Sequence, residues 1–510
     1  MRWGTGGFPA NRLAAVAAFA AFVLHLAGNP HYGFFRDELY LIVCGQHPQW
    51  GYVDQPALSP LLAAASQIFG PSLVLLRAVP ACFAAGGVYV AVRLAEEFGG
   101  AAFAQALAAL SVFFAPVLMS FGMKVSPDMV GLWLWPLAVL YLVRVVQGGD
   151  PRGWLAVGVA AGVALHGKYT AVFFLISLLA GLVLTRTRRV LFTRWFVLGC
   201  LACGVIALPS FLWQAHYGFP QLEMLRNAER GKNAIVGPLT FLLQQVVLTG
   251  MALALIWMAG LAWLFSRPGL RFLAYGFVVL MALMIGLHAK HYYPGDVYPY
   301  LFAAGAVALE GWTRGRRFVR AALTVGVVVT GLLLTPVVMP VLPEPQMVSY
   351  TRWLLARLGL EPKTLATEIR PEGELSSDWA GMHGWPELAS TVARVYQSLP
   401  EADRQRAVIA AENYGEASAI DFLGRPYGLP PVISGHNQYF LWGTHGYRGD
   451  VTICVGGDCG ARLHLFARCE RAATFTAPWV QPDENNLPIT VCRDIRIPLG
   501  EIWPRVKHYQ

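Results

Sequence analysis

The sequence predicts a polytopic α-helical membrane protein with about eleven transmembrane helices, followed by a C-terminal extracytoplasmic α/β domain. Two observations lead to this prediction. The 510 residues are 56% hydrophobic and only 14% charged, whereas soluble domains carry about 25% charged residues. The apolar residues also gather into long runs, and the composition turns mixed and polar beyond them. We therefore divide the chain into a membrane domain over 1–341 and a soluble α/β domain over 342–510.

A helix that crosses a bilayer needs roughly 17–25 mostly apolar residues, and each such run is a candidate span. The weakest pair is one long apolar run that is broken around Lys168. A single helix with a buried lysine is one interpretation. We favour two helices that meet at the outer surface, because Lys168 then reaches water. The candidate spans cover 11–28, 73–95, 101–120, 129–147, 153–166, 169–185, 195–213, 238–265, 272–289, 293–312 and 318–341.

Basic loops indicate the orientation, because short loops rich in Lys and Arg stay in the cytoplasm. With eleven spans and a cytoplasmic N-terminus, the arginine clusters near 186–194, 267–271 and 314–320 all fall inside. The formal net charge of +9 is explained by such clusters, so no nucleic-acid partner is expected. The first apolar segment is interpreted as a span, not as a cleaved signal peptide. We expect a multi-pass protein of a bacterial inner membrane, with loop 29–72 and the C-terminal domain outside.

The soluble domain alternates between short strand-like runs and a helix-like segment, which is typical of an α/β domain. A strand, a helix and a second strand in succession suggest a βαβ-like unit, and further short strands follow. The predicted strands cover 406–411, 431–434, 451–455, 461–467 and 488–497, and the predicted helix covers 415–422.

Four of the eight cysteines lie in this domain, and an even number in an extracytoplasmic domain favours disulfides. We expect the pairs Cys454–Cys459 and Cys469–Cys492, although four cysteines allow three pairings. Four reduced thiols are the alternative. A zinc site is disfavoured, because Cys454 and Cys459 lack the tight spacing of zinc ligands.

Charged residues in the outer loops are informative, because the membrane domain carries few charges and ionisable groups at membrane depth are costly unless paired or hydrated. Each has a structural alternative. Asp128 can cap the helix that follows it, His291 can be an ordinary interfacial residue, and Arg36 and Asp37 can simply mark a helix end. The outward charges and their aromatic neighbours include Arg36, Asp37, Glu38, Asp54, Lys124, Asp128, His166, Lys168, Tyr169, Lys290, His291 and Tyr292.

Acids and cations that converge on one membrane surface suit a transfer reaction on a lipid-linked phosphosugar. A carboxylate can act as general base on a hydroxyl or amine acceptor, and Lys or Arg can neutralise a phosphate leaving group. A lipid or sugar transporter that uses the same charges as a gate is a second hypothesis, but it favours acids at the midplane and inverted repeats. A scaffold whose soluble domain does the work is a third, and it needs no converging charges.

The first outer loop carries the most specific motif. Residues 36–40 (Arg-Asp-Glu-Leu-Tyr) with residues 51–56 (Gly-Tyr-Val-Asp-Gln-Pro) resemble the first periplasmic loop of glycosyltransferase family 39, whose members are membrane enzymes of the GT-C fold. These enzymes are related to protein O-mannosyltransferases and to the lipid A aminoarabinose transferase. The resemblance covers most of the chain, through weaker matches at 126–128, 167–170, 290–294, 412–417, 434–437 and 441–443.

The resemblance implies transfer of a sugar from a polyprenyl phosphate to a lipid, glycan or protein, with inversion at the anomeric carbon. Asp37 is then the general base or the acceptor-orienting carboxylate, Glu38 is its acidic neighbour, and Asp128 is the second acid. No cofactor is assigned. A divalent cation held by Asp37 and Asp128 is left open, because a full ligand set is not evident. The residues expected to bind substrate, with the phosphate facing the lysines and the histidine, are Arg36, Asp54, Lys168, Tyr169, Lys290, His291 and Tyr292.

Overall fold

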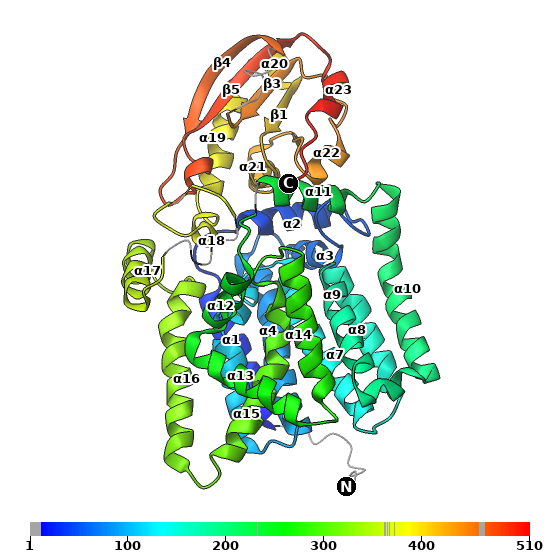
Figure 1. Cartoon of the computed structure of the whole chain (residues 1–510). Helices are drawn as coiled ribbons and strands as arrows, with labels where there is room; N and C mark the ends of the chain where they lie inside the picture. The colour runs from blue at the N-terminus through cyan, green and yellow to red at the C-terminus, as the bar shows by residue number, and fades with distance from the viewer. Residues whose placement is uncertain are drawn as a thin grey trace.

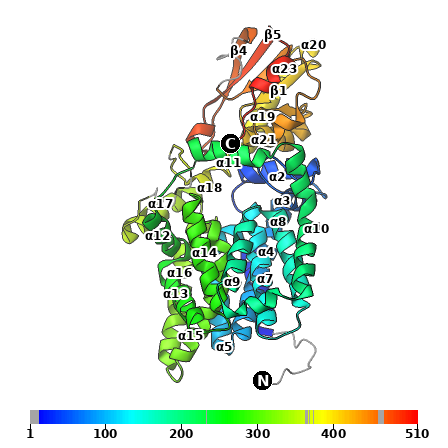
Figure 2. The ribbon, with the colours of Figure 1, turned by 45° about the vertical axis from the view of Figure 1, so that its right-hand side comes forward.

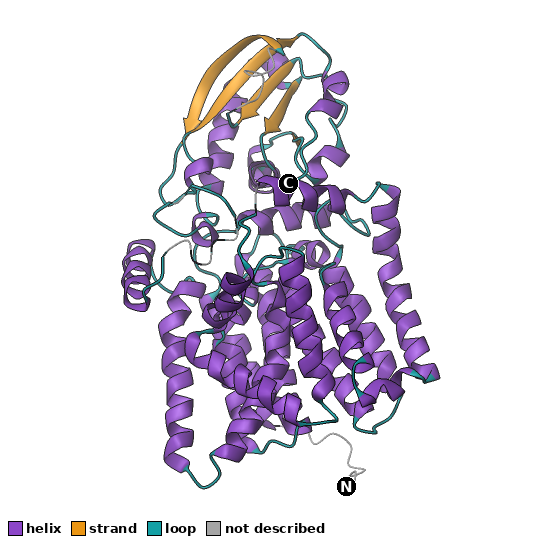
Figure 3. Ribbon diagram, viewed as in Figure 1, coloured by secondary structure: helices purple, strands orange, loops and turns teal. Residues whose placement is uncertain are grey.

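The apolar segments fold as helices that stand side by side, and a sheet-containing unit is stacked on one end of them (Figures 1 and 3). The structure is a computed structural model that describes residues 12–231, 233–361, 364, 366, 368–371, 373–457 and 465–510. Each segment predicted to span the membrane is helical over most of its length, so the helical class is confirmed.

The helical bundle contains a set of long, mostly uninterrupted helices joined by short 3₁₀ turns. The bounds of these helices (α) and of the 3₁₀ turns (η) are α1 (Arg12–Gly28), α4 (Leu73–Glu97), η1 (Pro127–Val130), α7 (Gly131–Val146), η2 (Arg186–Leu191), α10 (Arg194–His216), α11 (Pro220–Gly231), α14 (Arg271–Gly286), η3 (Tyr293–Val297), α15 (Tyr298–Trp312) and α16 (Arg317–Val338).

Helix length limits how many of these helices can be counted as spans. In the described part of the chain, four helices are long and apolar enough to cross a membrane, and a bent pair makes a fifth if it is one span. Other apolar helices have 10–17 residues, fewer than the roughly 20 of an untilted span. The number of eleven spans therefore stays a prediction. The four are Leu73–Glu97, Pro127–Val146, Arg194–His216 and Arg317–Val338.

The bent pair corresponds to the predicted span 238–265, which is not one straight helix. It divides into α12 (Pro238–Thr249) and α13 (Met251–Ser266), and the two helices meet at 110°. The residue between them, Gly250, has φ of +84°, a left-handed conformation that favours glycine. The two halves of this predicted span therefore run in different directions.

Two further breaks follow from local chemistry. The predicted span 101–120 is interrupted before Pro116, which has no N–H to continue a helix. The run around Lys168 is interrupted at that lysine, whose backbone is extended, so two helices form here and not one. The resulting pieces are α5 (Ala102–Phe114), α6 (Pro116–Phe121), α8 (Gly153–Gly167) and α9 (Ala171–Val183).

The segment 29–72, which is predicted as the first outer loop, contains two helices that the sequence did not predict. Helices α2 (Arg36–Gln46) and α3 (Leu58–Ala65) lie across the end of the bundle, beneath the sheet-containing unit (Figures 1 and 2). Most of α2 beyond its charged first turn is buried. Its apolar residues pack between the bundle and the soluble unit, and at 11 residues it is too short for a span.

The soluble unit is built on a five-stranded sheet of order β2-β1-β3-β5-β4. Strands β1, β2 and β3 are parallel, whereas β5 is antiparallel to both β3 and β4. Four of the predicted strands and the predicted helix are confirmed. Predicted strand 461–467 overlaps the start of β4, but 461–464 lie outside the described residues. The bounds are β1 (Ala407–Ala411), β2 (Val432–Ile433), β3 (Val451–Val455), β4 (Phe466–Phe475), β5 (Leu487–Ile495) and α21 (Tyr414–Leu423).

Shorter helices cover the sheet and connect it to the bundle. Helix α17 (Glu344–Leu358) follows the last bundle helix and projects to one side of the molecule (Figure 1). The others are α18 (Ser377–Ala380), α19 (Trp385–Ser398), α20 (Glu401–Arg404), η5 (Arg425–Tyr427), α22 (Gln438–Trp442), η6 (Pro482–Glu484), α23 (Leu499–Ile502) and η7 (Trp503–Arg505).

One predicted disulfide is present. Cys469 of β4 is bonded to Cys492 of β5, across an antiparallel register in which the two residues are direct partners. Cys454 is also disulfide-bonded, while Cys459, its predicted partner, lies outside the described residues. Cys44, Cys82, Cys200 and Cys203 are free thiols, and of these Cys44 is buried whereas Cys82 and Cys200 are exposed.

Candidate functional site

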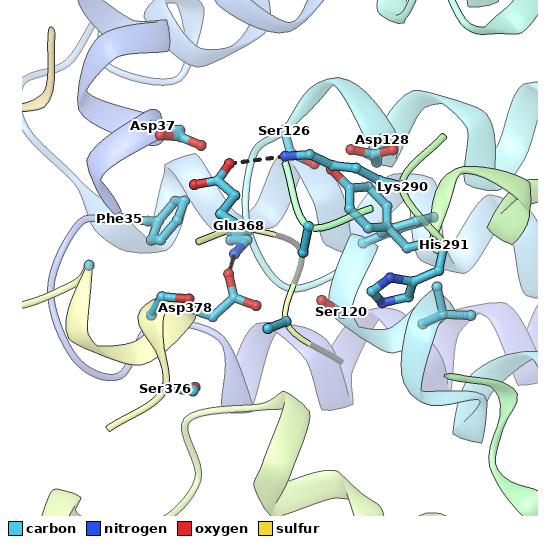
Figure 4. Close-up of a pocket in the computed structure, with 18 of the residues that line it drawn as sticks. Phe35, Asp37, Ser120, Ser126, Asp128, Lys290, His291, Glu368, Ser376 and Asp378 are labelled. Carbon is cyan, nitrogen blue, oxygen red and sulfur yellow. Dashed lines mark hydrogen bonds and ion pairs between the residues drawn. The ribbon is translucent and has the colours of Figure 1, made fainter. Parts of the chain in front are cut away.

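A cavity of about 1470 Å³ lies where the helical bundle meets the soluble unit. It is larger than the roughly 300–1,000 Å³ of a typical small-molecule pocket. One part of its wall is polar and comes from the loops that follow α1, α6, α8 and α14, and Figure 4 shows it. The other part is apolar and comes from α12, α16 and α17, with side chains such as Val247, Val337 and Leu354.

Asp37 lies in the first turn of α2, a favourable position for an acid. Its Oδ1 accepts hydrogen bonds from the Tyr414 hydroxyl at 2.8 Å and from Arg36 Nε at 3.2 Å. The Arg36 guanidinium also lies 5.4 Å from the centre of the Tyr414 ring. The Asp37 side chain is 43% exposed and lines the cavity, so a substrate can reach a carboxylate that the protein holds in place.

Glu38 requires a correction, because it does not line the cavity beside Asp37. It is fully buried and forms an ion pair at 3.0 Å with Arg77 of α4, which is also fully buried. Its oxygens additionally accept the backbone N–H groups of Phe35 at 2.9 Å and Val125 at 3.0 Å. Successive residues of a helix point roughly 100° apart, so Asp37 and Glu38 face different surroundings. Glu38 is an anchor of the first outer loop.

Asp128 is the second residue of η1 and forms an ion pair with Lys168, the first residue after α8. The Lys168 ammonium also faces the rings of Tyr293 at 4.0 Å and Tyr292 at 5.2 Å. Burial alone would lower the pKa of Lys168, but Asp128, and after it Tyr293, outweigh burial and raise it. The cavity therefore contains a charged lysine enclosed by an acid and two aromatic rings.

Asp296, which the sequence analysis did not single out as a site residue, lies behind this ion pair. Its carboxyl group is pressed against Gly131, where a Cβ atom would overlap it. Its Oδ1 is buried and has no hydrogen-bond partner among the described residues. The carboxyl group of Asp296 is therefore enclosed by the protein, and the close contact leaves no room for a side chain at position 131.

Lys290 forms an ion pair with Glu368 at 2.9 Å (Figure 4). Glu368 belongs to the segment after α17, and it also pairs with Arg370 at 3.2 Å. The neighbouring His291 is buried, and burial, followed by the charge of Lys290, lowers its pKa to about 4. His291 is thus neutral at physiological pH, and it can offer a hydrogen bond but not a positive charge.

Lys124 is the third lysine of the cavity, and the sequence analysis noted it without assigning it to substrate. It pairs with Asp378 of α18 at 2.5 Å and lies 3.9 Å from the centre of the Phe35 ring. Each of the cavity lysines thus contacts an acid from a distant part of the sequence. The positive charges are fixed in place before any ligand enters.

The remaining predicted residues also line the cavity. Asp54 accepts a hydrogen bond from the Tyr40 hydroxyl at 3.0 Å, and the Tyr169 hydroxyl is 2.7 Å from Ser210. The structure thus brings together every predicted site residue except Glu38, and their roles remain predictions. The predicted residues that line the cavity are Arg36, Asp37, Asp54, Asp128, Lys168, Tyr169, Lys290, His291 and Tyr292.

Several cavity residues were missed because the sequence gives little signal for them. Glu368, Arg370 and Asp378 stand in a polar stretch with no periodic pattern. Arg77, which lies outside the cavity and pairs with Glu38, had a usable signal, since a lone arginine inside an apolar run requires a buried partner. Within the described residues, no group of three or more His, Cys, Asp or Glu side chains is placed to hold a metal ion. A cation between Asp37 and Asp128 therefore stays an untested prediction.

Known proteins resemble this chain in part of its sequence and in its fold. Residues 47–213 match the family described as dolichyl-phosphate-mannose-protein mannosyltransferase. No protein of curated function matches the chain. The structure is similar to that of ArnT from Cupriavidus metallidurans in the apo state, with a TM-score of 0.60 and 15% sequence identity, over 94% of this chain and 97% of that one.

Two structures of the arabinofuranosyltransferase AftD from Mycobacteria are less similar. The TM-scores are 0.49 for one and 0.46 for a mutant, R1389S, with 15% identity in each case. They match 96% of this chain but only 40% and 42% of their own length. The family match and the likeness to ArnT confirm the resemblance that the first-loop motif suggested.

Proposed function

The chain has the fold of the GT-C glycosyltransferases, and we propose that it transfers a sugar from a polyprenyl-phosphate donor to an extracytoplasmic lipid, glycan or protein acceptor. One observation carries the proposal. A single cavity combines an exposed carboxylate, three lysines and a long apolar wall. A carboxylate can act as general base, lysines can neutralise a phosphate leaving group, and an apolar wall can hold a lipid chain.

In the proposed reaction, Asp37 accepts the proton of the acceptor hydroxyl or amine while that atom attacks the anomeric carbon. The bond between the anomeric carbon and the phosphate oxygen breaks, and the lipid phosphate leaves with the electron pair. Attack opposite the leaving group inverts the anomeric configuration. Asp37 is favoured as base over Asp128, because its side chain is 43% exposed whereas that of Asp128 is 15% exposed and paired with Lys168.

Lys168 and Lys290 are proposed to neutralise the donor phosphate, and Lys124 is a further candidate. Each of the three lysines is already paired with an acid. The phosphate would therefore either share the lysine with that acid or displace the acid, which is Asp128, Glu368 or Asp378. His291 and Tyr292 would add hydrogen bonds. The apolar wall formed by α12, α16 and α17 would hold the first isoprene units of the lipid.

The proposed location is a bacterial inner membrane, with the cavity and the soluble domain outside the cytoplasm. The arginine clusters support this orientation. Helix η2 and the α15–α16 connection lie at the end of the bundle opposite the sheet (Figure 1). We retain 1–341 as the membrane domain and 342–510 as the soluble domain, with α17 and α18 as the connection between them.

The direct test is transfer by the purified protein in liposomes, with short-chain polyprenyl-phosphate sugars and a panel of lipid, glycan and peptide acceptors. We expect the wild type to release lipid phosphate, and Asp37→Asn to lower kcat about 10²–10⁴-fold, as loss of a general base does. The anomeric configuration of the product, read by NMR, tests inversion.

A matched control is Asp494→Asn. Asp494 is also an arginine-paired aspartate, bonded to Arg468 at 2.7 Å, but it lies on the exposed end of β5 away from the cavity. It should keep full activity. Wild-type transfer that survives Asp37→Asn would remove Asp37 as base. Stabilisation by the donor without any release of phosphate would favour a transporter.

A further inference from the structure

Asp37, the proposed general base, accepts a hydrogen bond from Tyr414, a residue of the soluble unit. Tyr414 is the first residue of α21 and lies 377 positions after Asp37 in the chain. Its hydroxyl donates to Asp37 Oδ1 at 2.8 Å, and its ring faces the Arg36 guanidinium. Burial, above all, raises the pKa of Tyr414 well above its ordinary value, so the hydroxyl keeps its proton and stays a donor.

The start of α21 is shaped for this contact. Asn413 caps the helix, accepting the backbone N–H groups of Gly415 at 2.8 Å and Glu416 at 3.0 Å. Arg36 lies directly on Gly415, and a Cβ at that position would overlap the aliphatic part of the arginine. Gly415 has no need of a left-handed conformation here, so close approach explains why a glycine fits this position.

A second tyrosine repeats the arrangement. The Tyr40 hydroxyl donates to Asp54, another carboxylate of the cavity, at 3.0 Å. The rings of Tyr40 and Tyr414 pack against each other at 4.7 Å. Gln438 of the soluble unit also contacts the first loop. Its backbone N–H donates to the Tyr40 hydroxyl, and its side-chain oxygen accepts from the backbone N–H of Val53. Both cavity aspartates of the first loop are therefore positioned through the soluble unit.

We propose that the soluble unit is part of the catalytic centre, with Tyr414 as a positioning residue that orients Asp37 and stabilises its ionised form. The inference rests on the proposed role of Asp37 as base. A hydrogen bond to a carboxylate favours the charged form, and a base must be charged to accept a proton. The proposed reaction then requires the soluble unit to be docked on α2.

Other charged groups surround the same aspartate and set the background for a pH experiment. Arg36 of α2 and Tyr414 of α21 are in contact with it. Glu368, with its partners Lys290 and Arg370, approaches from the segment after α17. Glu484 of η6 faces Arg36. A substitution that removes only the tyrosine hydroxyl leaves all of these charges in place.

The test is Tyr414→Phe, with two readouts. The first is the pH dependence of transfer, whose acidic limb should move up by about one unit, with kcat lowered about tenfold and KM for the donor unchanged. The second is the pH dependence of carbodiimide labelling at Asp37, followed by mass spectrometry. Carbodiimides react with protonated carboxyl groups, so the labelling midpoint should rise by the same amount, and this readout does not need activity.

Tyr439→Phe is the matched control. Tyr439 is a buried tyrosine of the same unit, and its hydroxyl donates to Asp421 at 2.7 Å, outside the cavity. It should change neither readout. Gly415→Ala is a second variant that displaces Arg36 without removing a polar group, and it should shift the labelling midpoint in the same direction as Tyr414→Phe.

The possible outcomes separate the two proposals. A shifted labelling midpoint in a protein that transfers no sugar would support the contact and reject the transferase. Normal transfer that depends on Asp37, with Tyr414→Phe matching the wild type in both readouts, would reject the positioning role and keep the transferase.

Discussion

Single side chains in this protein are held by partners from distant parts of the chain. Lys168 contacts Asp128, Lys290 contacts Glu368, and Arg77 contacts Glu38. Burying one member of such a pair without the other costs about 3–5 kcal/mol, so each pair also fixes the elements that carry it. The pair of Arg77 and Glu38 ties α4 to α2, and the cavity pairs tie the loops to each other.

Asp421 shows how one buried acid supports the helix that carries Tyr414. It lies in α21 and accepts hydrogen bonds from Tyr439 at 2.7 Å and from the backbone of Val432 at 2.9 Å. Burial raises its pKa from 3.8 to about 6, in spite of these hydrogen bonds. A raised pKa means that the folded state binds the proton more tightly, so its contribution to stability is greatest below pH 4 and is lost as the pH rises to 6.

We therefore predict that Asp421→Asn flattens the pH dependence of unfolding. The wild type should lose on the order of 2 kcal/mol between pH 4 and pH 7 through this group, a shift of a few degrees in Tm. The measurement is thermal unfolding of the full chain in detergent, followed by tryptophan fluorescence at both pH values. Asp494→Asn, an exposed acid, should keep the wild-type slope. An equal slope in Asp421→Asn would contradict the prediction.

At the scale of elements, the bend between α12 and α13 decides the shape of the cavity. Helix α12 contributes Gln244, Val247 and Leu248 to the wall, and it reaches them because the chain turns by 110° at Gly250. A side chain at a φ of +84° is strained by about 1–2 kcal/mol. The angle of α12 is therefore tied to one glycine.

Gly250→Ala should lower Tm by a few degrees and weaken donor binding about tenfold, because α12 no longer lines the apolar wall correctly. Microscale thermophoresis with the lipid-linked sugar measures the affinity. Gly204→Ala is the control, since Gly204 lies within α10 with no other atom within 4 Å of a Cβ, and alanine favours helices. If both variants bind the donor like the wild type, the bend at Gly250 does not determine how α12 lines the apolar wall.

Some helices could be predicted from the sequence and others could not. Apolar runs predicted the bundle helices well, and the extended break at Lys168 follows from a charge that must reach water or a partner. Helix α2 was missed because an 11-residue apolar helix resembles neither a span nor a loop. The contact of Asp37 with Tyr414 joins residues 377 positions apart, and no local pattern encodes such a distance.

On the scale of the whole molecule, the sheet-containing unit sits on one end of the helical bundle, and the arginine-rich connections lie at the other end (Figure 1). The family match covers 47–213, which includes Asp54, Asp128 and Lys168 but not Asp37 or the soluble unit. The likeness to ArnT extends over 94% of the chain, so the stacking of the two units belongs to the shared fold.

The proposed orientation predicts which positions a membrane-impermeant maleimide can reach in intact cells. In a background with Cys44, Cys82, Cys200 and Cys203 replaced by alanine, Glu401→Cys should be labelled at once. The carboxylate of Glu401 is 71% exposed on the soluble unit. Arg188→Cys, in η2 at the opposite end, should be labelled only after the cells are permeabilised. Labelling of both positions in intact cells would reject the orientation.

The distance between Asp37 and Tyr414 along the chain also has a consequence in time. At roughly 5–20 residues per second, a ribosome needs roughly 20–75 seconds to synthesise the 377 residues that separate them. In the proposed orientation the first loop crosses the membrane during that interval, before the tyrosine that holds its aspartate has been synthesised. Under the proposed mechanism, full activity therefore begins only when the C-terminal unit has been exported and has folded onto α2.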